Sequence, residues 1–398
     1  MMTINKTESA PREALGLYFH IPFCIRKCNY CDFLSFGGTT EEEQKDYFRV
    51  LHREIEFYSS IYSNKYYVDS IFVGGGTPSL VEEGLIHELM SAVRNGFSVD
   101  QNAEISIESN PKTLTKKKLE TYLAAGINRL SMGVQSFDEN LLSAMGRVHS
   151  PEDILANYAL ARECGFRNFN LDLMFAIPGQ TKQIWLNTLR QAIELEPEHI
   201  SFYSLQLEEG TPYFSMFQEG SLKEIEDELD REMYHEAIKT FKDSGYQHYE
   251  ISNASKDGYQ CRHNLKYWSM DDYLGLGIGA HSYMGGVRFS NITNLKDYVQ
   301  AEPNTASSNR SPFVQWHHKN TKEENISEYI FTGMRKLEGL DLRDFETRFE
   351  MSIEDIFSAN WHRLQKYIDE EYLVKSAENM RFTIKGIDIS NTILTEFV

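Results

Sequence analysis

The 398-residue sequence has few cysteines, a deficit of basic residues and no long apolar run. No stretch approaches the roughly 18 consecutive apolar residues of a membrane span, and the start MMTINKTESAPRE lacks the apolar segment of a signal peptide. Both absences predict a cytoplasmic protein without an integral membrane segment. Five cysteines are too few for a disulfide scaffold. With 40 Lys and Arg against 59 Asp and Glu, the net charge of -19 repels phosphate polymers, which disfavours nucleic acid as a partner.

What the sequence does contain is a regular alternation of apolar runs and helical stretches. A content of 41% hydrophobic and 25% charged residues is typical of a folded protein, and the length suggests two or three domains. Six β-rich runs are expected to be strands: residues 15–21, 68–73, 103–109, 128–134, 168–175 and 200–206. Because parallel neighbours need a crossover connection, strands that alternate with helices predict an α/β fold with a parallel sheet.

Capping signals delimit the helices between these strands. After the second run, Thr77 and Pro78 are expected to cap and begin a helix. Before the fifth run, Ser150 and Asp153 form a capping box, and Gly165 is expected to end that helix.

The pattern changes after the sixth run. A charged helix over 225–242 precedes a stretch rich in Gly, Tyr, His and Asn, which we expect to be irregular up to about residue 300, and a polar linker follows around Pro303 to Pro312. Beyond it, two helical segments and a short hairpin, LVKSAENMRFTI, predict a compact accessory domain, mainly helical and winged-helix-like. We therefore predict three parts: a core over 1–230, a connecting segment over 231–305 and the accessory domain over 306–398.

Three of the five cysteines crowd together directly after the first strand. Cys24, Cys28 and Cys31 have the spacing C-x3-C-x2-C. Three thiolates on a short loop can converge on one iron-sulfur cluster or one zinc ion. Structural zinc normally has four protein ligands, yet no fourth cysteine is near and His20 lies within the predicted strand. Three cysteines on a [4Fe-4S] cluster leave one iron open to another ligand, so the spacing favours the cluster and keeps zinc as the alternative.

Polar or glycine residues follow several strands at their carboxyl ends. In parallel α/β barrels, ligands bind at this edge of the sheet. The second strand runs into GGGTP at 74–78, where missing side chains let a ligand approach the backbone, and Glu108, Gln135 and Asp172 end later strands. Each of these residues alone could instead be a cap or a hydrogen-bonded core residue. Arg147 could bind a carboxylate or cap a loop.

The cysteine motif with Tyr30 before its third cysteine, GGGTP, and the sixfold alternation together closely resemble the radical S-adenosylmethionine (SAM) enzymes. The resemblance implies a partial (β/α)6 TIM-like barrel. It also implies that the open iron of a [4Fe-4S] cluster binds the amino and carboxylate groups of SAM, with the glycine loop along that cofactor. An electron donor then reduces the cluster, and SAM is split into methionine and a 5'-deoxyadenosyl radical.

Further segments resemble the coproporphyrinogen oxidase-like subfamily over nearly the whole chain. They are YFHIPFC, CNYCDF, GGGTPS, NRLSMGVQSF, LDLMFAIPGQT, HNLKYW and YLGLGIGAHSY. The resemblance implies SAM contacts from Tyr18, Tyr30, Gly75, Gly76, Thr77, Glu108, Gln135, Arg147 and Asp172. Ser204 and His281 match the pattern less closely.

This subfamily divides into oxygen-independent coproporphyrinogen III oxidases and HemW-type heme chaperones. In the oxidases the motif continues to a fourth cysteine two positions after the third, where this sequence has Phe33. Only 23 residues precede Cys24, whereas the oxidases have a long extension there. The HNxxYW motif associated with the chaperones is present at 263–268. All three features favour the chaperones.

The HNxxYW motif suggests how heme would bind. The imidazole of His263 is the expected iron ligand, with Tyr267 and Trp268 packed on the macrocycle and Cys261 or His281 as alternative ligands. A histidine beside two aromatic residues is otherwise a common core arrangement.

The sequence thus predicts a heme chaperone that transfers heme to apo-hemoproteins, retains the cluster and SAM, and could form a homodimer. One alternative is the oxidase, which decarboxylates two propionates of coproporphyrinogen III. Another is a radical SAM enzyme with a different small substrate, in which HNxxYW is only structural.

Overall fold

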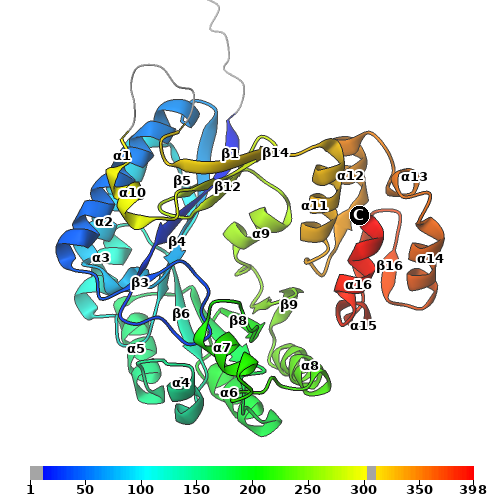
Figure 1. Cartoon of the computed structure of the whole chain (residues 1–398), viewed down its shortest axis with the longest axis horizontal. Coiled ribbons are helices and arrows are strands. Elements are labelled where there is room, and N and C mark those ends of the chain that lie inside the picture. The colour runs from blue at the N-terminus through cyan, green and yellow to red at the C-terminus, as the bar shows by residue number, and fades with distance from the viewer. Residues whose placement is uncertain (1–11, 303–310) are drawn as a thin grey trace, which may run out of the picture.

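Six parallel strands form the centre of the structure, a computed structural model that describes residues 12–302 and 311–398 (Figure 1). They are β1 (Glu13–Ile21), β4 (Tyr66–Gly75), β5 (Val99–Ser109), β6 (Arg129–Gln135), β7 (Phe169–Phe175) and β8 (His199–Ser204). They follow one another in the sheet in chain order, and each pairs in parallel with the next. All six correspond to predicted runs, and the expected partial (β/α)6 barrel is confirmed.

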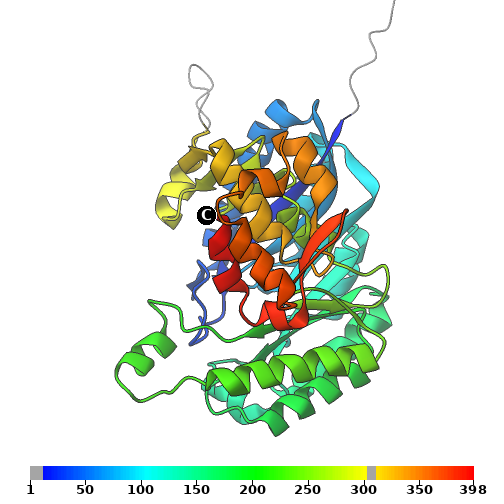
Figure 2. The ribbon, with the colours of Figure 1, turned by 90° about the vertical axis from the view of Figure 1, so that its right-hand side faces the viewer.

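Helices cover the outer face of this sheet (Figure 1). They are α1 (Glu41–Tyr62), α2 (Glu83–Gly96), α3 (Lys116–Ala124), α4 (Glu139–Ala144), α5 (Pro151–Cys164), α6 (Lys182–Glu194) and α8 (Asp227–Asp243). A further short helix, α7 (Pro212–Gln218), projects away from the barrel (Figure 2). Because both faces of the strands are covered, their sequences are nearly continuous apolar runs, and all seven residues of β6 are buried.

The predicted caps hold for one helix and fail for another. Ser150 and Asp153 form the capping box of α5, and Gly165 ends that helix in the left-handed conformation, with φ 113°. Thr77 and Pro78 do not begin α2. They open a short 3-10 helix, Pro78–Leu80, and α2 itself begins at Glu83 because the chain is extended again at Val81.

The stretch expected to be irregular contains strands that extend the sheet at both edges. Next to β1 lie β11 (Tyr273–Leu276), β12 (His281–Met284), β13 (Val287–Asn291) and β14 (Val314–Lys319); next to β8 lie β10 (Asn253–Ser255) and β9 (Gln247–Glu250). These strands have only three to six residues, too few for a clear alternating pattern. A short helix, α10 (Leu295–Gln300), precedes the predicted linker, of which residues 303–310 lie outside the described ranges.

The HNxxYW motif forms a helix, α9 (Arg262–Trp268), in the opening between the two ends of the curved sheet (Figure 1). Glu104 of β5 accepts hydrogen bonds from the backbone N–H groups of Arg262 and His263, both at 3.1 Å. A carboxylate at the amino end of a helix satisfies free N–H groups and is favoured by the helix dipole. Glu104 thereby ties α9 to the barrel interior.

The C-terminal unit packs on the open side of the barrel (Figures 1 and 2). Its helices are α11 (Lys322–Gly333), α12 (Leu342–Phe349), α13 (Ile353–Ile356), α14 (Trp361–Asp369), α15 (Ile384–Ile387) and α16 (Ser390–Leu394). A small sheet joins β15 (Leu340–Asp341), β16 (Leu373–Lys375) and β17 (Asn379–Phe382), and the β16–β17 pair is the predicted hairpin. β14, at 314–319, belongs to the large sheet instead; the proposed boundaries at 230 and 305 remain predictions.

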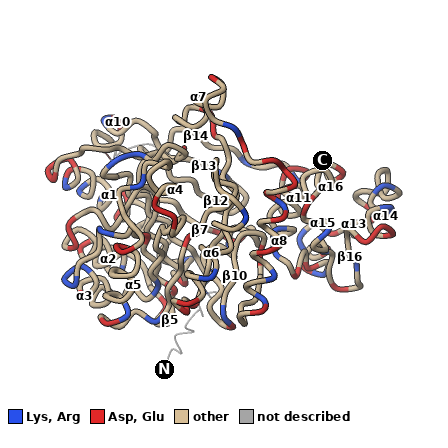
Figure 3. The backbone as a smooth tube through the Cα atoms, turned by 90° about the horizontal axis from the view of Figure 1, so that it is seen from below, with Lys and Arg blue, Asp and Glu red and all other residues tan. Residues whose placement is uncertain are grey.

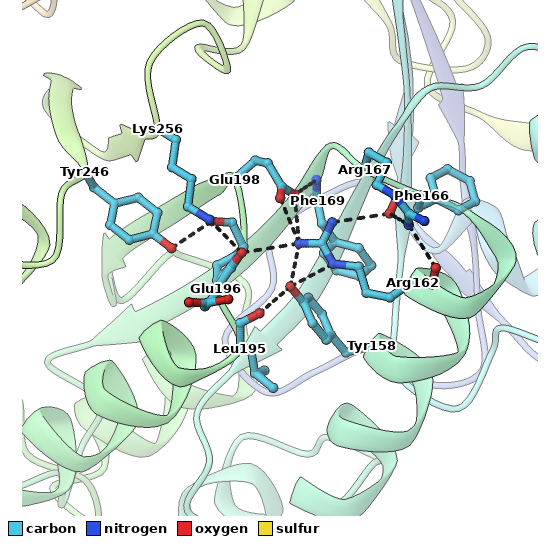
Figure 4. Close-up of polar contacts among 11 residues, drawn as sticks. Tyr158, Arg162, Phe166, Arg167, Phe169, Leu195, Glu196, Glu198, Tyr246 and Lys256 are labelled. Carbon is cyan, nitrogen blue, oxygen red and sulfur yellow. Dashed lines mark hydrogen bonds and ion pairs between the residues drawn. The ribbon is translucent and has the colours of Figure 1, made fainter.

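A polar network fixes the amino ends of β7 and β8, away from the site described below (Figure 4). Arg162 of α5 donates to Glu198 (2.8 Å) and to the hydroxyl of Tyr158, and Glu198 in turn accepts from the N–H of Phe169 (3.0 Å). One guanidinium therefore joins a helix to two strand starts.

Basic and acidic residues are interspersed along the chain in both the barrel and the C-terminal unit (Figure 3). Within the described ranges, no helix combines the length and apolar character needed to cross a membrane.

Candidate functional site

A cavity of about 400 Å³ lies at the carboxyl ends of the parallel strands, and most of the predicted site residues line it. Those brought together are Cys24, Cys28, Cys31, Tyr30, Gly75, Gly76, Thr77, Glu108, Gln135, Arg147, Asp172 and Ser204. We call this space the first cavity. Among the predicted SAM contacts, Tyr18 and His281 do not line it.

The cysteine loop is held in place by three neighbouring segments. Cys24 lies in β2 (Phe23–Cys24), which pairs with β3 (Phe36–Gly37) at the end of the loop. The backbone N–H of Asn29 donates to Met145 (2.9 Å), and its carbonyl accepts from the N–H of Tyr213 in α7 (2.9 Å). Arg26 donates to the carbonyl of Gly146 (2.6 Å). The loop is thus positioned by protein contacts on both sides.

The three thiols of the loop are free. Within the described ranges, no three His, Cys, Asp or Glu side chains lie close enough to bind one metal ion. A [4Fe-4S] cluster binds each thiolate at a different iron, so its ligands stand farther apart than those of zinc.

Arg147 connects the cysteine loop to two strand ends. It donates to the Sγ of Cys28 (3.6 Å) and to the carbonyl of Gly133 (2.6 Å), and it also contacts the side chain of Asn110. Asn110 donates in turn to the Oγ1 of Thr77 (2.8 Å). The sequence analysis missed Asn110, although its place two residues after Glu108 at a strand end is the signal that could have identified it.

The glycine loop leaves bare backbone facing the first cavity. Gly75 has φ 113°, and a Cβ there would lie 2.7 Å from the ring of His20. At Gly76, a Cβ would lie 2.9 Å from the carbonyl oxygen of Phe23. Both positions therefore exclude a side chain, because His20 and the backbone of Phe23 occupy the space that it would need. The N–H of Gly75 donates to Glu108 (2.9 Å), which fixes the loop against β5.

Two buried carboxyl groups, those of Glu108 and Asp172, line the first cavity. Burial and the neighbouring Asp172 raise the pKa of Glu108 to about 8. Burial also raises the pKa of Asp172, although it accepts hydrogen bonds from Ser131 (3.0 Å) and Asn170 (2.8 Å). Like charges in a buried site disfavour double ionisation. Glu108 therefore keeps its proton at neutral pH in the absence of a ligand.

Gln135 has an unusual backbone for its residue type. It ends β6 with φ 65°, and the β6–β7 register shifts between Gly133 and Gln135. The left-handed region costs a non-glycine residue roughly 1 kcal/mol or more. The irregularity directs Gln135 to the lining of the first cavity.

A second cavity of about 640 Å³ adjoins the first, and Asp32 and Phe33 line both. Its other lining residues are Tyr18, His20, Leu34, Tyr267, Trp268, Met270, Tyr273, Gly279, Ala280, His281, Arg288, Thr293 and Thr332. We call this space the second cavity. Two residues of the HNxxYW motif therefore reach a cavity, but it is not the one that contains the cysteines.

Tyr18 lies in the wall of the second cavity, apart from most of the other predicted SAM contacts. Its hydroxyl is hydrogen-bonded to Nδ1 of His20 (2.9 Å). Nε2 of His20 is bonded to the carbonyl of Leu34 (2.8 Å), beyond the cysteine loop. In this structure Tyr18 supports the loop through His20 and makes no contact with the first cavity.

His263 is not available as a heme ligand in this conformation. It has no solvent exposure, and its ring nitrogens are bonded to the hydroxyls of Ser70 (3.0 Å) and Tyr267 (2.8 Å). Burial and the nearby Lys266 lower the pKa of His263 to about 3, so the ring is neutral. Cys261, one of the alternative ligands, is equally buried, and its thiol contacts Glu104 (3.5 Å).

Family comparisons match both parts of this architecture. The model of the radical SAM superfamily matches residues 18–192, and the HemN C-terminal domain matches residues 320–389. The protein named heme chaperone HemW from Bacillus subtilis is 34% identical, over 96% of this chain and 98% of its own length. Its namesake from Escherichia coli is also 34% identical, with the same coverage. The chain belongs to the HemW family of radical SAM proteins.

The HemW family shares its fold with the oxidases. The solved structure of coproporphyrinogen III oxidase HemN from Escherichia coli superposes with a TM-score of 0.84 at 24% identity, covering 98% of this chain and 91% of that one. Radical SAM proteins typically contain a [4Fe-4S] cluster and bind SAM, and the first cavity offers this HemW family member three thiols beside a glycine loop.

Proposed function

We propose that this chain is a heme chaperone that binds heme and transfers it to apo-hemoproteins, while carrying a [4Fe-4S] cluster and SAM. The main support is the similarity over 96% of the chain to proteins named heme chaperone HemW. Phe33, at the position where the oxidases have a fourth cysteine, is in keeping with this assignment. The cytoplasmic location, the electron donor and a homodimer remain predictions.

The cluster would be held by Cys24, Cys28 and Cys31, and SAM by the glycine loop and the polar residues around it. Together, the two groups would supply one-electron chemistry when bound. Arg147 would help to hold the thiol of Cys28 in place for the cluster, because it donates to that Sγ.

Glu108 would change its protonation state when a ligand binds in the first cavity. Without a ligand its carboxyl is protonated at neutral pH, because its pKa lies at about 8. A cationic ligand such as SAM would favour the carboxylate, so binding would be accompanied by proton release from Glu108. The bond from Gly75 would hold this carboxyl in position in both states.

The test compares heme binding with oxidase turnover in the full chain after anaerobic reconstitution of the cluster. Hemin titration should give a saturable Soret band with about one heme per chain. Incubation with coproporphyrinogen III, SAM and a reductant should give no decarboxylated product by mass spectrometry. Stoichiometric formation of that product would identify an oxidase and contradict the proposal, as would the absence of heme binding.

A further inference from the structure

We propose that heme binds in the second cavity and that His281 is the axial ligand of its iron. This inference rests on the proposed function, because it names the site at which a heme chaperone of this structure would hold its cargo. It moves the ligand from His263, where the sequence motif places it, to a residue 18 positions later in the chain.

The first argument is the availability of ring nitrogens. Both nitrogens of His263 already have partners within the protein fold. His20, the other histidine of the cavity wall, is likewise bonded at both nitrogens. His281 begins β12, its side chain is exposed, and within the described part of the chain no residue is hydrogen-bonded to its ring. It is therefore the histidine of this wall with a nitrogen free for iron.

The protonation state of His281 also suits an iron ligand. Partial burial and the guanidinium of Arg288 lower the pKa of His281. A neutral imidazole presents a lone pair, whereas the protonated ring does not. No proton therefore has to be displaced at neutral pH before iron binds.

The walls of the second cavity suit a flat aromatic ligand. The cavity is lined by Phe33, Tyr267, Trp268 and Tyr273. The rings of Tyr267 and Tyr273 pack edge to face, with their centres 4.5 Å apart. The guanidinium of Arg335 lies 4.4 Å from the centre of the Trp268 ring, which holds the indole in place. A volume of about 640 Å³ is in the usual range for a cofactor site of roughly 300–1,000 Å³.

One cation of the wall can meet the propionate groups of heme. Arg288 is held by Glu328 at Nε (2.8 Å) and by the hydroxyl of Tyr273 at Nη1 (3.1 Å). Its Nη2 has no hydrogen-bond partner among the described residues. Arginine binds carboxylates well because its donors lie in a fixed plane. Arg288 and His281 come from neighbouring antiparallel strands, β13 and β12.

A single exposed histidine also suits a protein that must release its cargo. A ligand at the rim can be replaced by a histidine of the acceptor without opening the core. His263 would instead require the disruption of α9 and two buried hydrogen bonds.

The experiment is a hemin titration of the full chain with its reconstituted cluster, comparing His281→Ala, His281→Met, His263→Ala and His317→Ala. His317 is the control because it is an exposed histidine on β14 outside the second cavity. We expect His281→Ala to weaken heme binding at least tenfold, and His281→Met to change the Soret and near-infrared bands to those of a methionine-ligated heme. His317→Ala should leave both unchanged.

Cluster absorbance and SAM affinity, measured on each variant, verify that it is folded. If His281→Ala keeps the affinity and spectrum of the wild type, the ligand assignment is wrong even though the protein binds heme. An equal loss in His317→Ala would indicate adventitious binding to surface histidines and overturn the site. If the wild type binds no heme, both the proposed function and this inference are wrong. If the wild type binds heme and His281→Ala has no effect, only this inference is wrong.

Discussion

At the scale of single residues, Glu54 is a buried carboxyl that joins distant parts of the chain. It has no solvent exposure and accepts hydrogen bonds from the N–H of Gly277 (2.9 Å), the amide of Asn291 (2.6 Å) and the hydroxyl of Tyr298 (2.6 Å). Burial raises the pKa of Glu54 to about 7, since the three donors only partly offset the loss of hydration. The folded protein therefore keeps a proton here that the unfolded chain releases.

This residue makes stability depend on pH. Between the ordinary glutamate pKa of about 4.3 and the folded value of about 7, the folded state binds more protons, so raising the pH lowers the free energy of unfolding. Between pH 5 and 8 this loss amounts to about 2 to 3 kcal/mol. Urea denaturation at both pH values should show that Glu54→Gln reduces the loss by that amount. Equal losses in variant and wild type would show that Glu54 is ionised throughout.

His263 shows what single-residue patterns can and cannot predict. The HNxxYW motif identified a histidine and two aromatic residues beside a cavity, and two of the three do line it. His263 and Tyr267 are four positions apart, so in a helix they lie on one face and can bond to each other. The sequence contained this signal, but the segment was expected to be irregular. The partner Ser70 could not be predicted, because it comes from a strand nearly 200 residues away.

At the scale of elements, the network around Arg162 joins α5 to the starts of β7 and β8 (Figure 4). The side chains of Arg162 and Glu198 are only 22% and 13% exposed, so removing one charge leaves the other without its partner. Arg162→Ala should lower the free energy of unfolding by about 2 kcal/mol. The cluster absorbance should be unchanged, because the network lies at the opposite ends of the strands from the first cavity.

Urea denaturation measures the free energy of unfolding, and the absorbance of the reconstituted protein measures the cluster. Arg190→Ala is the matched control, since that side chain is 67% exposed and its i,i+4 partner Glu194 is 4.0 Å away. Such pairs contribute about 0.5 kcal/mol or less. A similar stability for both variants, or loss of the cluster in Arg162→Ala, would contradict this account.

Sequence patterns predicted the long elements and missed the short ones. The six barrel strands are apolar runs between capped helices, and these signals are local. β9 to β13 have at most five residues each, too few for a clear alternating pattern, and β10 and β11 join the sheet by pairing with β8 and β1, which are distant in the chain. The predicted start of α2 at Thr77 and Pro78 was wrong, because α2 begins at Glu83. Thr77 and Pro78 are a valid capping pair, but the backbone there follows the glycine loop and completes only one turn.

At the scale of the whole molecule, the C-terminal unit is attached to the barrel edge by backbone pairing. Ile251 donates its N–H to Arg335 (3.1 Å), and Leu337 donates to Tyr249 (3.0 Å). The guanidinium of Arg335 also packs on Trp268 of α9 and lies 3.8 Å from the buried carboxylate of Glu250. These contacts connect the residues after α11 with β9 and the helix that fills the barrel opening.

Arg335→Ala should loosen this connection without unfolding the barrel. It removes the charge beside Glu250 and the group packed on Trp268, so the edge pairing is expected to open more often. Hydrogen exchange should then be at least several-fold faster at the amides of Ile251 and Leu337, and unchanged in β6. Arg343→Ala, at a side chain 76% exposed and paired with Glu378, serves as the control. Unchanged exchange at Ile251 would show that Arg335 does not stabilise the contact.

One segment of the chain forms part of the wall of both cavities and would couple their occupants. Phe33 is 63% exposed and Asp32 lies beside it, and both border the space around the cysteines and the aromatic cavity. A ligand that shifts this segment in one cavity alters the walls of the other. Such an effect would be reciprocal. If the occupant of the first cavity changed the dissociation constant of the occupant of the second by some factor, the second occupant would change that of the first by the same factor. Phe33, at the position where the oxidases have a fourth cysteine, is thus a surface that both occupants would share.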